Sequence, residues 1–335
     1  MKEADIRPKN LHDGILEISR GDVERLILPN KKGLEKIPCP GCGSWRASFQ
    51  FQKFGMDYVL CQDCYSLYLS PRPKDSFLQQ CYPKMKSVQY WESHFYRETA
   101  PQRRRRIYAP RARKVTKLFR QYGNAESKTL IDVGCGYGIF LEEVEKLSFF
   151  NKLIGIEPSP SLAAVCQKRG FHVVQKSVSD LASSDIPEPA SIITCFEVLE
   201  HVNSPPEFLT SLSRLLEPGG LLVLTAPSVS GLDVQLLWEK SKTVYPPHHI
   251  NLLSVEGVRK LVERAGTLQL VDISTPGLLD VNIIQNAKNE GYDLTLGRFF
   301  DYIFSREDEK LLADLQRFCQ KHNLSSHLMA VLRKM

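Results

Sequence analysis

Four cysteines of the 335-residue chain form two pairs whose types and spacing suit a metal ion. Cys39 and Cys42 stand in C-P-G-C-G, and after 18 intervening residues Cys61 and Cys64 stand in C-Q-D-C. Two tight turns of this kind offer two thiolates each to one tetrahedral Zn²⁺, and the residues between the pairs suffice for a β-hairpin. The alternative is two chance pairs of buried or free cysteines. We predict a ribbon whose zinc is structural, because four thiolates leave no open coordination position.

A glycine-rich turn, L-I-D-V-G-C-G-Y-G-I-F, is the second chemical feature. Asp132 closes an apolar run, and Gly134, Gly136 and Gly138 follow it. Glycine tolerates positive φ and has no Cβ, so a nucleotide-like ligand can rest against such a strand-to-helix turn. The spacing differs from the dinucleotide fingerprint G-x-G-x-x-G, and the carboxylate would repel a pyrophosphate but suit a cationic amino-acid end. Glu157, in I-G-I-E-P-S, can accept hydrogen bonds from both ribose hydroxyls.

Acidic and imidazole side chains form the third group. Glu197, Glu200 and His201 stand in C-F-E-V-L-E-H-V, and His248 and His249 stand in P-P-H-H-I-N-L-L-S. One of these side chains can take a proton from a hydroxyl, and the candidates are His201, Glu197 and His249. Alternatively, Glu197, Glu200 and His201 could bind Mg²⁺. A third interpretation is that Glu200 and His201 only cap a turn.

The hydrophobic pattern predicts the scaffold that positions these groups. Short apolar runs alternate with amphipathic helical patterns, as in a parallel sheet with crossover helices. The predicted strands are residues 129–133, 153–157, 172–175, 191–196, 221–225 and 268–273. The predicted helices are residues 139–147, 161–168, 206–216 and 255–264. Ser204 and Ser254 are expected to be the N-caps of the last two. The fold class is therefore α/β, a Rossmann-like doubly wound sheet.

The remaining sequence is organised around this sheet. A helix or strand is expected within residues 14–28, and a helix over 112–122, where Val115, Leu118, Phe119 and Tyr122 recur at helical spacing. The six predicted segments are a lead-in (1–36), the four-cysteine ribbon (37–80), a basic helical linker (81–125), the doubly wound domain (126–281), a helical insertion (282–327) and a last strand (328–335).

Composition limits the class of protein. The chain has 44 Lys and Arg against 38 Asp and Glu, a net charge of +6, and 42% hydrophobic residues. This composition is that of a globular chain and excludes disorder as its dominant state. Its apolar stretches are far shorter than the roughly 20 residues that span a bilayer. The N-terminal sequence M-K-E-A-D-I-R-P-K-N has no apolar secretory core, so we expect a cytoplasmic protein without a membrane span.

Four motifs taken together resemble class I S-adenosylmethionine-dependent methyltransferases over about residues 129–275. They are D-V-G-C-G-Y-G, I-E-P-S, C-F-E-V-L-E-H-V and L-L-E-P-G-G-L-L-V-L. The resemblance implies that Asp132 faces the methionine ammonium and that Glu157 holds the ribose. It also implies a role in cofactor binding for Gly134, Gly136, Gly138, Ser177, Val178 and Phe196. Ser177 stands where relatives commonly carry an acid near the adenine amine, with Asp180 three residues later.

The ribbon and the helical insertion also resemble parts of methyltransferases that modify sugars, sugar nucleotides or surface polysaccharides. P-P-H-H-I-N-L-L-S resembles a substrate-facing segment of such proteins. The resemblance implies methyl transfer to a small-molecule or glycan acceptor. Because a sulfonium is already activated, the protein needs mainly to align the reactants, exclude water and remove a proton. Cys135 is accordingly predicted to be a packing residue.

Two other functions stay open. E-x-x-E-H with a later histidine is similar to Mg²⁺-assisted methyltransferases that modify a ribose hydroxyl of RNA, and the run Arg103–Arg106 could meet its phosphates. That run could equally be the solvated face of a helix. The third hypothesis is a non-catalytic protein whose ribbon and basic helix bind a partner.

Overall fold

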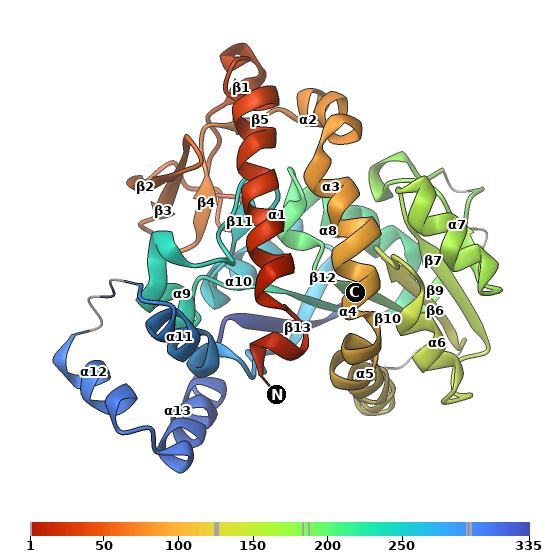
Figure 1. Cartoon of the computed structure of the whole chain (residues 1–335). Helices are drawn as coiled ribbons and strands as arrows, with labels where there is room; N and C mark the ends of the chain where they lie inside the picture. The colour runs from red at the N-terminus through yellow and green to blue at the C-terminus, as the bar shows by residue number, and fades with distance from the viewer. Residues whose placement is uncertain (1, 124–126, 183, 187, 293, 295–296) are drawn as a thin grey trace. The chain divides into compact units, whose positions relative to one another are not determined.

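The computed structural model describes residues 2–123, 127–182, 184–186, 188–292, 294 and 297–335 (Figure 1). They fold into two units. Unit 1 consists of Met1–Ser87, Ala226–Val258 and Ser274–Met329. Unit 2 consists of Val88–Thr225, Arg259–Ile273 and Ala330–Met335. Each unit combines three separate stretches, whereas the six predicted segments follow one another along the chain. The predicted boundary between residues 125 and 126 lies outside the described residues.

A seven-stranded sheet carries most of unit 2. Its strand order is β12-β13-β10-β9-β6-β7-β8. The strands are β6 (Thr129–Val133), β7 (Lys152–Ile156), β8 (His172–Val174), β9 (Ala190–Phe196), β10 (Leu216–Pro227), β12 (Leu268–Ser274) and β13 (His327–Lys334). β6 pairs in parallel with β7 on one side and with β9 on the other, and all five of its residues are buried. The doubly wound α/β class is therefore confirmed, and β13 begins one residue before the predicted last strand.

β10 is the strand that departs most from its predicted range. It begins at Leu216, five residues before the predicted start. Its pairing with β9 shifts in register between Leu216 and Leu221, where the sequence E-P-G-G intervenes and Gly219 has φ 74°. A bulge explains the difference, because glycine and proline mark an irregular stretch of a strand that still belongs to the sheet.

The crossover helices form where the apolar periodicity predicts them. They are α6 (Ile139–Glu145), α7 (Pro160–Lys168), α8 (Pro205–Leu215) and α10 (Val255–Ala265). Ser254 Oγ accepts the Gly257 N–H at 2.8 Å, as an N-cap does. Ser204 occupies the N-cap position of α8, but its side chain accepts no cap hydrogen bond. The predicted N-cap position of Ser204 is therefore confirmed, and Pro206 at the second helical position has no N–H to donate to its side chain.

A nearly continuous helical stretch precedes the sheet. It comprises α3 (Lys86–Tyr90), a π-helical turn (Trp91–Phe95), α4 (Tyr96–Arg103), a second π-helical turn (Arg104–Tyr108) and α5 (Ala109–Tyr122). The predicted apolar face of α5 is confirmed, since Val115, Leu118 and Phe119 are buried and the helix packs on α6. The predicted helical linker therefore becomes part of unit 2 from Val88 onward.

Unit 1 contains a four-stranded antiparallel sheet of order β11-β4-β3-β2. The strands are β2 (Ala47–Lys53), β3 (Met56–Cys61), β4 (Leu67–Leu69) and β11 (Asn251–Leu252). β2 and β3 form the hairpin predicted between the cysteine pairs. Its two-residue turn is Phe54-Gly55, with φ of 51° and 79°, the positive values that suit the twist of a tight hairpin. A separate pair joins β1 (Leu34–Glu35) to β5 (Arg72–Pro73).

Helices complete unit 1. They are α1 (Lys9–Asp22), α2 (Asp75–Cys81), α9 (Leu232–Leu237), α11 (Asp280–Asn289), α12 (Arg298–Ser305) and α13 (Glu309–Lys321). The lead-in is thus helical, and the predicted helical insertion is confirmed apart from residues 293, 295 and 296, which are not described. Its core brings together Val281 and Ile284 of α11, Ile303 and Phe304 of α12, and Leu312 of α13.

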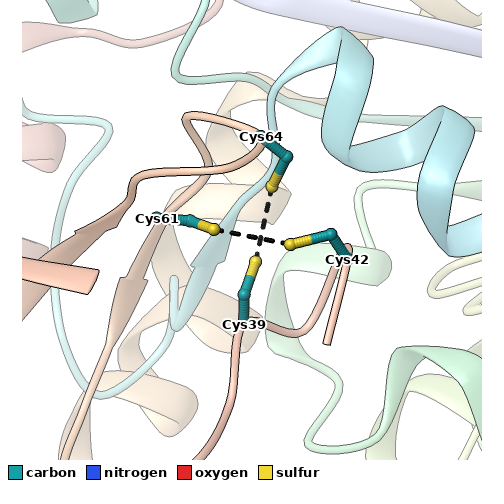
Figure 2. Close-up of side chains that lie close together, drawn as sticks. All are labelled: Cys39, Cys42, Cys61 and Cys64. Atoms are coloured by element: carbon teal, nitrogen blue, oxygen red, sulfur yellow. Dashed lines mark hydrogen bonds between the residues drawn. The ribbon is translucent and has the colours of Figure 1, made fainter. Parts of the chain in front are cut away.

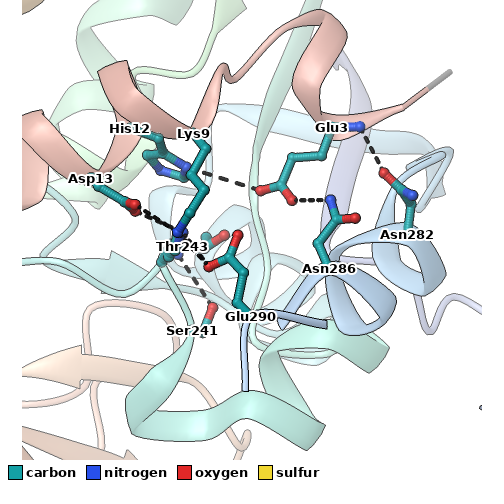
Figure 3. A network of polar contacts seen from close by, with 10 residues as sticks. Glu3, Lys9, His12, Asp13, Ser241, Thr243, Asn282, Asn286 and Glu290 are labelled. Carbon is teal, nitrogen blue, oxygen red and sulfur yellow. Dashed lines mark hydrogen bonds and ion pairs between the residues drawn. The ribbon is translucent and has the colours of Figure 1, made fainter. Parts of the chain in front are cut away.

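A polar network ties α1 to the rest of unit 1 (Figure 3). Lys9 Nζ lies 3.1 Å from Asp13 and 3.0 Å from Glu290. Lys242 Nζ lies 2.7 Å from Asp13 and 3.3 Å from Glu290. The Glu3 carboxylate accepts the Asn286 side-chain amide at 2.9 Å. Opposite charges therefore link α1, Glu290 just after α11 and the loop that contains Lys242.

Among the residues placed in the structure, no helix is long and apolar enough to cross a membrane.

Candidate functional site

Asp132 is the last residue but one of β6 and is 4% exposed. Its Oδ1 accepts the Thr194 hydroxyl of β9 at 2.7 Å, because the sheet register places Thr194 directly beside Asp132. Burial raises the pKa of the Asp132 carboxyl to about 7, against the lowering effect of the Thr194 hydrogen bond and with the Glu157 charge as a further raising cause. A buried acid in this state favours a cationic ligand, which would stabilise its ionised form.

The glycine turn, residues 132–138, requires its glycines. Gly134 and Gly138 have φ of 72° and 74°. A Cβ on Gly134 would lie 2.7 Å from Val198 Cγ2, and one on Gly138 would lie 2.5 Å from Cys166 Sγ. Left-handed φ and close neighbours therefore exclude larger residues. The Cys135 sulfur lies 3.9 Å from that of Cys166, and both are buried, in keeping with a packing role.

Glu157 follows β7 and folds back on the glycine turn. Its Oε2 accepts the Gly136 N–H and its Oε1 accepts the Ser159 N–H, both at 2.9 Å. Burial raises the pKa of Glu157, and these two backbone hydrogen bonds oppose that rise. The structure thus brings together Asp132, the three glycines and Glu157 at the carboxyl ends of β6 and β7, where ligands of doubly wound sheets bind.

Aromatic residues of the preceding helices cover this turn, and sequence reasoning missed them. Tyr96 Oη would lie 3.4 Å from a Cβ on Gly136. Its hydroxyl is 3.0 Å from that of Tyr108, and its ring meets Tyr137 edge-on with centroids 4.7 Å apart. Burial raises the pKa of Tyr96 well above its usual value, so the hydroxyl stays protonated. The sequence signal that could have identified these residues is the aromatic-rich run W-E-S-H-F-Y, whose aromatic residues recur at helical spacing.

Hydrogen bonds join the same helices to the turn that follows β7. The Glu92 carboxylate accepts the Ser159 hydroxyl at 2.7 Å and the Ser161 hydroxyl at 2.5 Å. The Tyr137 hydroxyl donates to the Glu92 carbonyl. Residues predicted to be a linker therefore form one wall of the candidate ligand site.

The residues assigned to adenine lie after β8. Val178 is 9% exposed and begins a 3₁₀ turn, Val178–Asp180. The Ser177 hydroxyl donates to Asp180 Oδ2 at 2.7 Å. Asp180 therefore accepts a hydrogen bond from Ser177, the residue that stands where relatives commonly carry an acid. The adenine role of Ser177 and Val178 stays a prediction.

Glu197 follows β9 in a left-handed conformation, with φ 58°. Its Oε1 accepts the Arg111 guanidinium at 3.0 Å and the Thr225 hydroxyl at 2.5 Å. The Arg111 guanidinium also lies 4.9 Å from the centroid of the Phe196 ring, which packs edge-on against Phe140. An ion pair and a hydroxyl donor therefore hold the Glu197 carboxylate in place.

Glu200 and His201 lie on a short 3₁₀ turn, Leu199–His201. The Glu200 side chain is 1% exposed and the His201 side chain 39%. His201 Nε2 lies 3.8 Å from Glu200 Oε1. The imidazole is thus accessible to a ligand while an acid backs it, an arrangement that suits proton transfer.

His249 belongs to unit 1, on the histidine segment, residues 245–254. Its Nδ1 lies 2.6 Å from the Thr243 carbonyl oxygen. Because a carbonyl only accepts, Nδ1 carries the hydrogen and Nε2 is the proton-accepting nitrogen. The His249 carbonyl accepts the hydroxyl of the fully buried Tyr58 at 2.7 Å.

The ribbon holds this segment at further points. β11 pairs with β4, and the Leu69 N–H donates to the Ile250 carbonyl at 3.0 Å. The Arg72 guanidinium donates to the Asn251 side chain at 3.0 Å, and Ser66 Oγ accepts the Ser254 N–H at 3.1 Å. The ribbon and the histidine segment therefore form one sheet, although some 180 residues separate their sequences.

The four ribbon cysteines point at one another (Figure 2). The Cys39 and Cys64 sulfurs lie 3.5 Å apart, those of Cys42 and Cys61 lie 3.4 Å apart, and all four are within 4.8 Å of one another. Zn–S bonds of about 2.3 Å at tetrahedral angles place sulfurs about 3.8 Å apart. The cluster therefore fits a four-thiolate metal site.

The fold and the glycine turn define the class of protein. A doubly wound sheet with an acid at the end of β6, three glycines in the turn that follows, and a second acid after the neighbouring strand β7 is the arrangement of class I S-adenosylmethionine-dependent methyltransferases. Residues 102–271, about half of the chain, match a family model described as a methyltransferase domain. The chain belongs to this family.

Curated relatives agree with this assignment. The mitochondrial ubiquinone biosynthesis O-methyltransferase of Schizosaccharomyces pombe is 32% identical over 123 residues, which are 34% of this chain and 43% of that protein. Its counterpart from Candida albicans is 40% identical over 108 residues, 30% of this chain and 33% of that protein. The matches thus span less than half the length of either relative.

The plantazolicin methyltransferase BpumL, solved with a pentazolic desmethylPZN analog and SAH, has a TM-score of 0.50 and 16% identity, covering 77% of this chain and 94% of that one. At this identity the likeness shows the fold alone.

Proposed function

We propose that the chain transfers a methyl group from S-adenosylmethionine to a hydroxyl of a small-molecule acceptor. The observation that carries the proposal is the buried Asp132 carboxyl beside a glycine turn that Glu157 holds from the next strand. This site has a place for an ammonium group and a backbone surface free of Cβ atoms. When bound, S-adenosylmethionine would supply the methyl group on an activated sulfonium.

The chain's own residues would bind and orient that ligand. Asp132 would accept hydrogen bonds from the ammonium group, and Glu157 would accept them from the ribose hydroxyls, since a carboxylate oxygen can accept more than one hydrogen bond. Val178 and Ser177 would lie beside the adenine. Tyr96 would help to exclude water, because its ring and hydroxyl lie over Gly136.

The acceptor class rests on the relatives and on the histidines. The relatives are named as O-methyltransferases of ubiquinone biosynthesis, which supports a small molecule with a hydroxyl. The finer proposal is a sugar, a sugar nucleotide or a glycan. Glu197, held by Arg111, would position that acceptor, and His201 and His249 are the proposed proton acceptors.

The ribbon cysteines are proposed to hold a structural Zn²⁺. Cys39, Cys42, Cys61 and Cys64 supply four thiol groups at fitting distances, and a closed thiolate site has no role in bond making. Such thiolates persist in a reducing compartment, which supports the proposed cytoplasmic location.

Two of the four arginines in the run Arg103–Arg106, which the RNA alternative would use, make contacts within unit 2. Arg104 pairs with Glu142 and Glu143 of α6, and the Arg103 guanidinium lies over the Trp91 ring, 5.5 Å from its centroid. These side chains therefore hold unit 2 together. A magnesium ion at Glu197, Glu200 and His201 likewise stays an untested alternative.

The experiment is methyl transfer from isotopically labelled S-adenosylmethionine to a panel of acceptors. The panel contains catechols, sugar nucleotides and short RNAs, each with and without a chelator of Mg²⁺. Label in a catechol or a sugar nucleotide, with no loss of turnover in chelator, supports the proposal. Label in RNA alone, lost in chelator, would contradict it.

A further inference from the structure

One face of α5 and the segment that follows α6 enclose a hollow on the surface of unit 2. This basic hollow has a volume of about 290 Å³. Its lining residues are Arg113, Thr116, Lys117 and Arg120 of α5, with Leu147 and Phe149 after α6. All of them belong to unit 2. The hollow combines a basic wall with an apolar wall, and the proposed methyl transfer uses neither.

The basic wall places like charges side by side. Arg113, Lys117 and Arg120 are exposed, and their spacings of four and three residues put them on one stripe of α5. Over the ranges that the structure describes, no carboxylate lies within ion-pair distance of these three side chains. Lys146, by contrast, pairs with Glu143 at 2.5 Å. Like charges at helical spacing repel one another, so a bound anion would relieve an unfavourable interaction.

The Phe149 ring brings a fourth cation to the basic hollow. The Arg120 guanidinium carbon lies 4.8 Å from the centroid of this ring, and Lys128 Nζ lies 4.9 Å from it. The rings of Phe119 and Phe150 hold Phe149 edge-on, with centroids 5.9 Å and 5.0 Å away. Attraction to this fixed ring restrains both cations. They therefore lose less side-chain freedom when they bind an anion.

The basic hollow lies at the opposite end of β6 from the glycine turn. Lys128 immediately precedes β6, and Phe149 comes shortly before β7. The Lys128 carbonyl accepts the Asn151 N–H at 2.8 Å, which joins the two segments. The glycine turn follows the other end of β6, and four residue steps along a strand span roughly 13 Å. A ligand in the hollow is therefore distinct from S-adenosylmethionine and from its methyl acceptor.

The two walls indicate the chemistry of the ligand. Guanidinium groups bind phosphate oxygens through paired N–H donors, and an ammonium group adds a point charge. Leu147 is 37% exposed and Phe149 is half-buried, so the apolar wall can cover a hydrocarbon or an aromatic ring. The volume is near the lower end of the roughly 300–1,000 Å³ of small-molecule pockets. A hollow of this size favours a small molecule over RNA or a membrane, which would require an extended basic face.

We propose that the basic hollow binds a small phosphate ester. Arg113, Lys117 and Arg120 bind its phosphate group, and Lys128 adds positive charge beside them. The apolar or aromatic part of the ester packs on Leu147 and Phe149. The inference goes beyond the proposed methyl transfer and does not depend on it.

Calorimetric titration of the full-length, zinc-loaded protein with phenyl phosphate tests the proposal, because this probe carries both parts of the ligand. We expect saturable binding that is about tenfold tighter than that of inorganic phosphate, since burial of the ring adds to the attraction between charges. Prior saturation with S-adenosylhomocysteine should leave the affinity unchanged. Equal affinity for the two probes, or no saturable binding of phenyl phosphate, would overturn the proposal.

Two matched variants distinguish a built site from general attraction between charges. Lys117 and Lys114 are both exposed on α5, and replacement of either by Gln removes one positive charge, but only Lys117 lines the hollow. Lys117→Gln should weaken phenyl phosphate binding about tenfold through loss of a charge-assisted hydrogen bond, and Lys114→Gln by less than about twofold. Thermal unfolding of each variant verifies its fold. Equal effects of the two substitutions would contradict the proposal.

The apolar wall has a test of its own. Leu147→Ala should weaken phenyl phosphate binding about threefold, because it removes apolar surface, and should leave inorganic phosphate binding unchanged. A loss of affinity for both probes would show that the apolar part is not recognised.

Macromolecular ligands are tested with a single-stranded RNA and with vesicles that contain phosphatidylglycerol. Tighter binding of either than of phenyl phosphate, lost in Lys117→Gln and kept in Lys114→Gln, would replace the small ester by that partner. The proposed function is judged separately. A protein that binds phenyl phosphate but not S-adenosylmethionine would refute the proposed function alone, and the reverse pattern would refute only the inference about the basic hollow.

Discussion

The glycine turn of unit 2 and the histidine segment of unit 1 hold their polar groups by different means. In the turn, Asp132 and Glu157 follow paired strands, and their partners Thr194 and Gly136 come from the same sheet and turn. In the histidine segment, the side chains depend on distant parts of the sequence. Ser87 lies 161 residues from His248, and Tyr58 lies 191 residues from His249.

Because of this difference, we expect a substitution that disrupts one of the two sites to leave the structure of the other intact. The turn is fixed by parallel pairing and left-handed glycines, which belong to unit 2 alone. The histidine segment adds one short strand, β11, to the ribbon sheet. Loss of the ribbon should therefore disorder the histidines and spare the turn.

The largest expected effect is that of removing two metal ligands. Cys61→Ser with Cys64→Ser should abolish zinc binding, because two of the four ligands are lost. The ribbon should then unfold, since a structural zinc site contributes on the order of 10 kcal/mol to folding. Residues 248–254 should then lose their protection against hydrogen exchange. S-adenosylmethionine affinity should stay within about threefold, which calorimetry measures.

The control for this double variant is Cys135→Ser, which changes a buried cysteine outside the ribbon and should keep its zinc. Retained zinc in the double variant, or unchanged exchange at residues 248–254, would contradict the linkage between the ribbon and the histidines.

The second largest expected effect is the loss of ligand binding at the glycine turn. Asp132→Ala should lower S-adenosylmethionine affinity about 100-fold, because a charge-assisted hydrogen bond and its ion pair contribute roughly 3 kcal/mol. Zinc content and exchange at the histidine segment should not change. Calorimetry and metal analysis on one sample give both results, and unimpaired binding would show that Asp132 does not meet the ammonium.

The pH dependence of binding sharpens the assignment of Asp132. The pKa of Asp132 is about 7 in the folded protein, above its ordinary value of 3.8. The contribution of the protonated Asp132 carboxyl to folding stability is therefore complete below about pH 4 and is lost as the pH rises through 7. A cationic ligand prefers the ionised form. Affinity should therefore fall about tenfold per pH unit below pH 7, with proton release on binding at pH 6. Affinity independent of pH between 5.5 and 7.5 would contradict this.

The smallest effect concerns a buried acid of unit 1. Burial raises the pKa of Asp233 well above its ordinary value, and the nearby Asp280 raises it further. Its contribution to stability is thus present below about pH 4 and lost as pH rises. Asp233→Asn, which cannot ionise, should stabilise the protein by about 1 kcal/mol at pH 8 and by nothing near pH 4.

Thermal unfolding at both pH values measures the Asp233 effect. Asp280→Asn is the contrast, because the Asp280 carboxylate accepts the Ser326 N–H at 2.6 Å and the Gln316 amide at 2.8 Å. That variant should be destabilised at both pH values. A destabilised Asp233→Asn at pH 8 would show that the aspartate is needed as an anion.

The sequence predicts the first site better than the second for a physical reason. Strand and helix periodicity place Asp132 and Glu157 at the carboxyl ends of neighbouring strands, so short motifs suffice. The pairing of β11 with β4, the hydrogen bond between Ser87 and His248 and the position of Tyr96 over Gly136 are contacts between distant residues. No local pattern encodes them, which is why residues 81–125 read as a linker.

The most direct test of the central claim is calorimetric titration of the purified, zinc-assayed protein with S-adenosylmethionine and S-adenosylhomocysteine, with ATP and NAD as controls. The site at the glycine turn predicts micromolar binding of the first pair alone, a free energy of about −8 kcal/mol. Absence of binding, or equal binding of ATP or NAD, would contradict it.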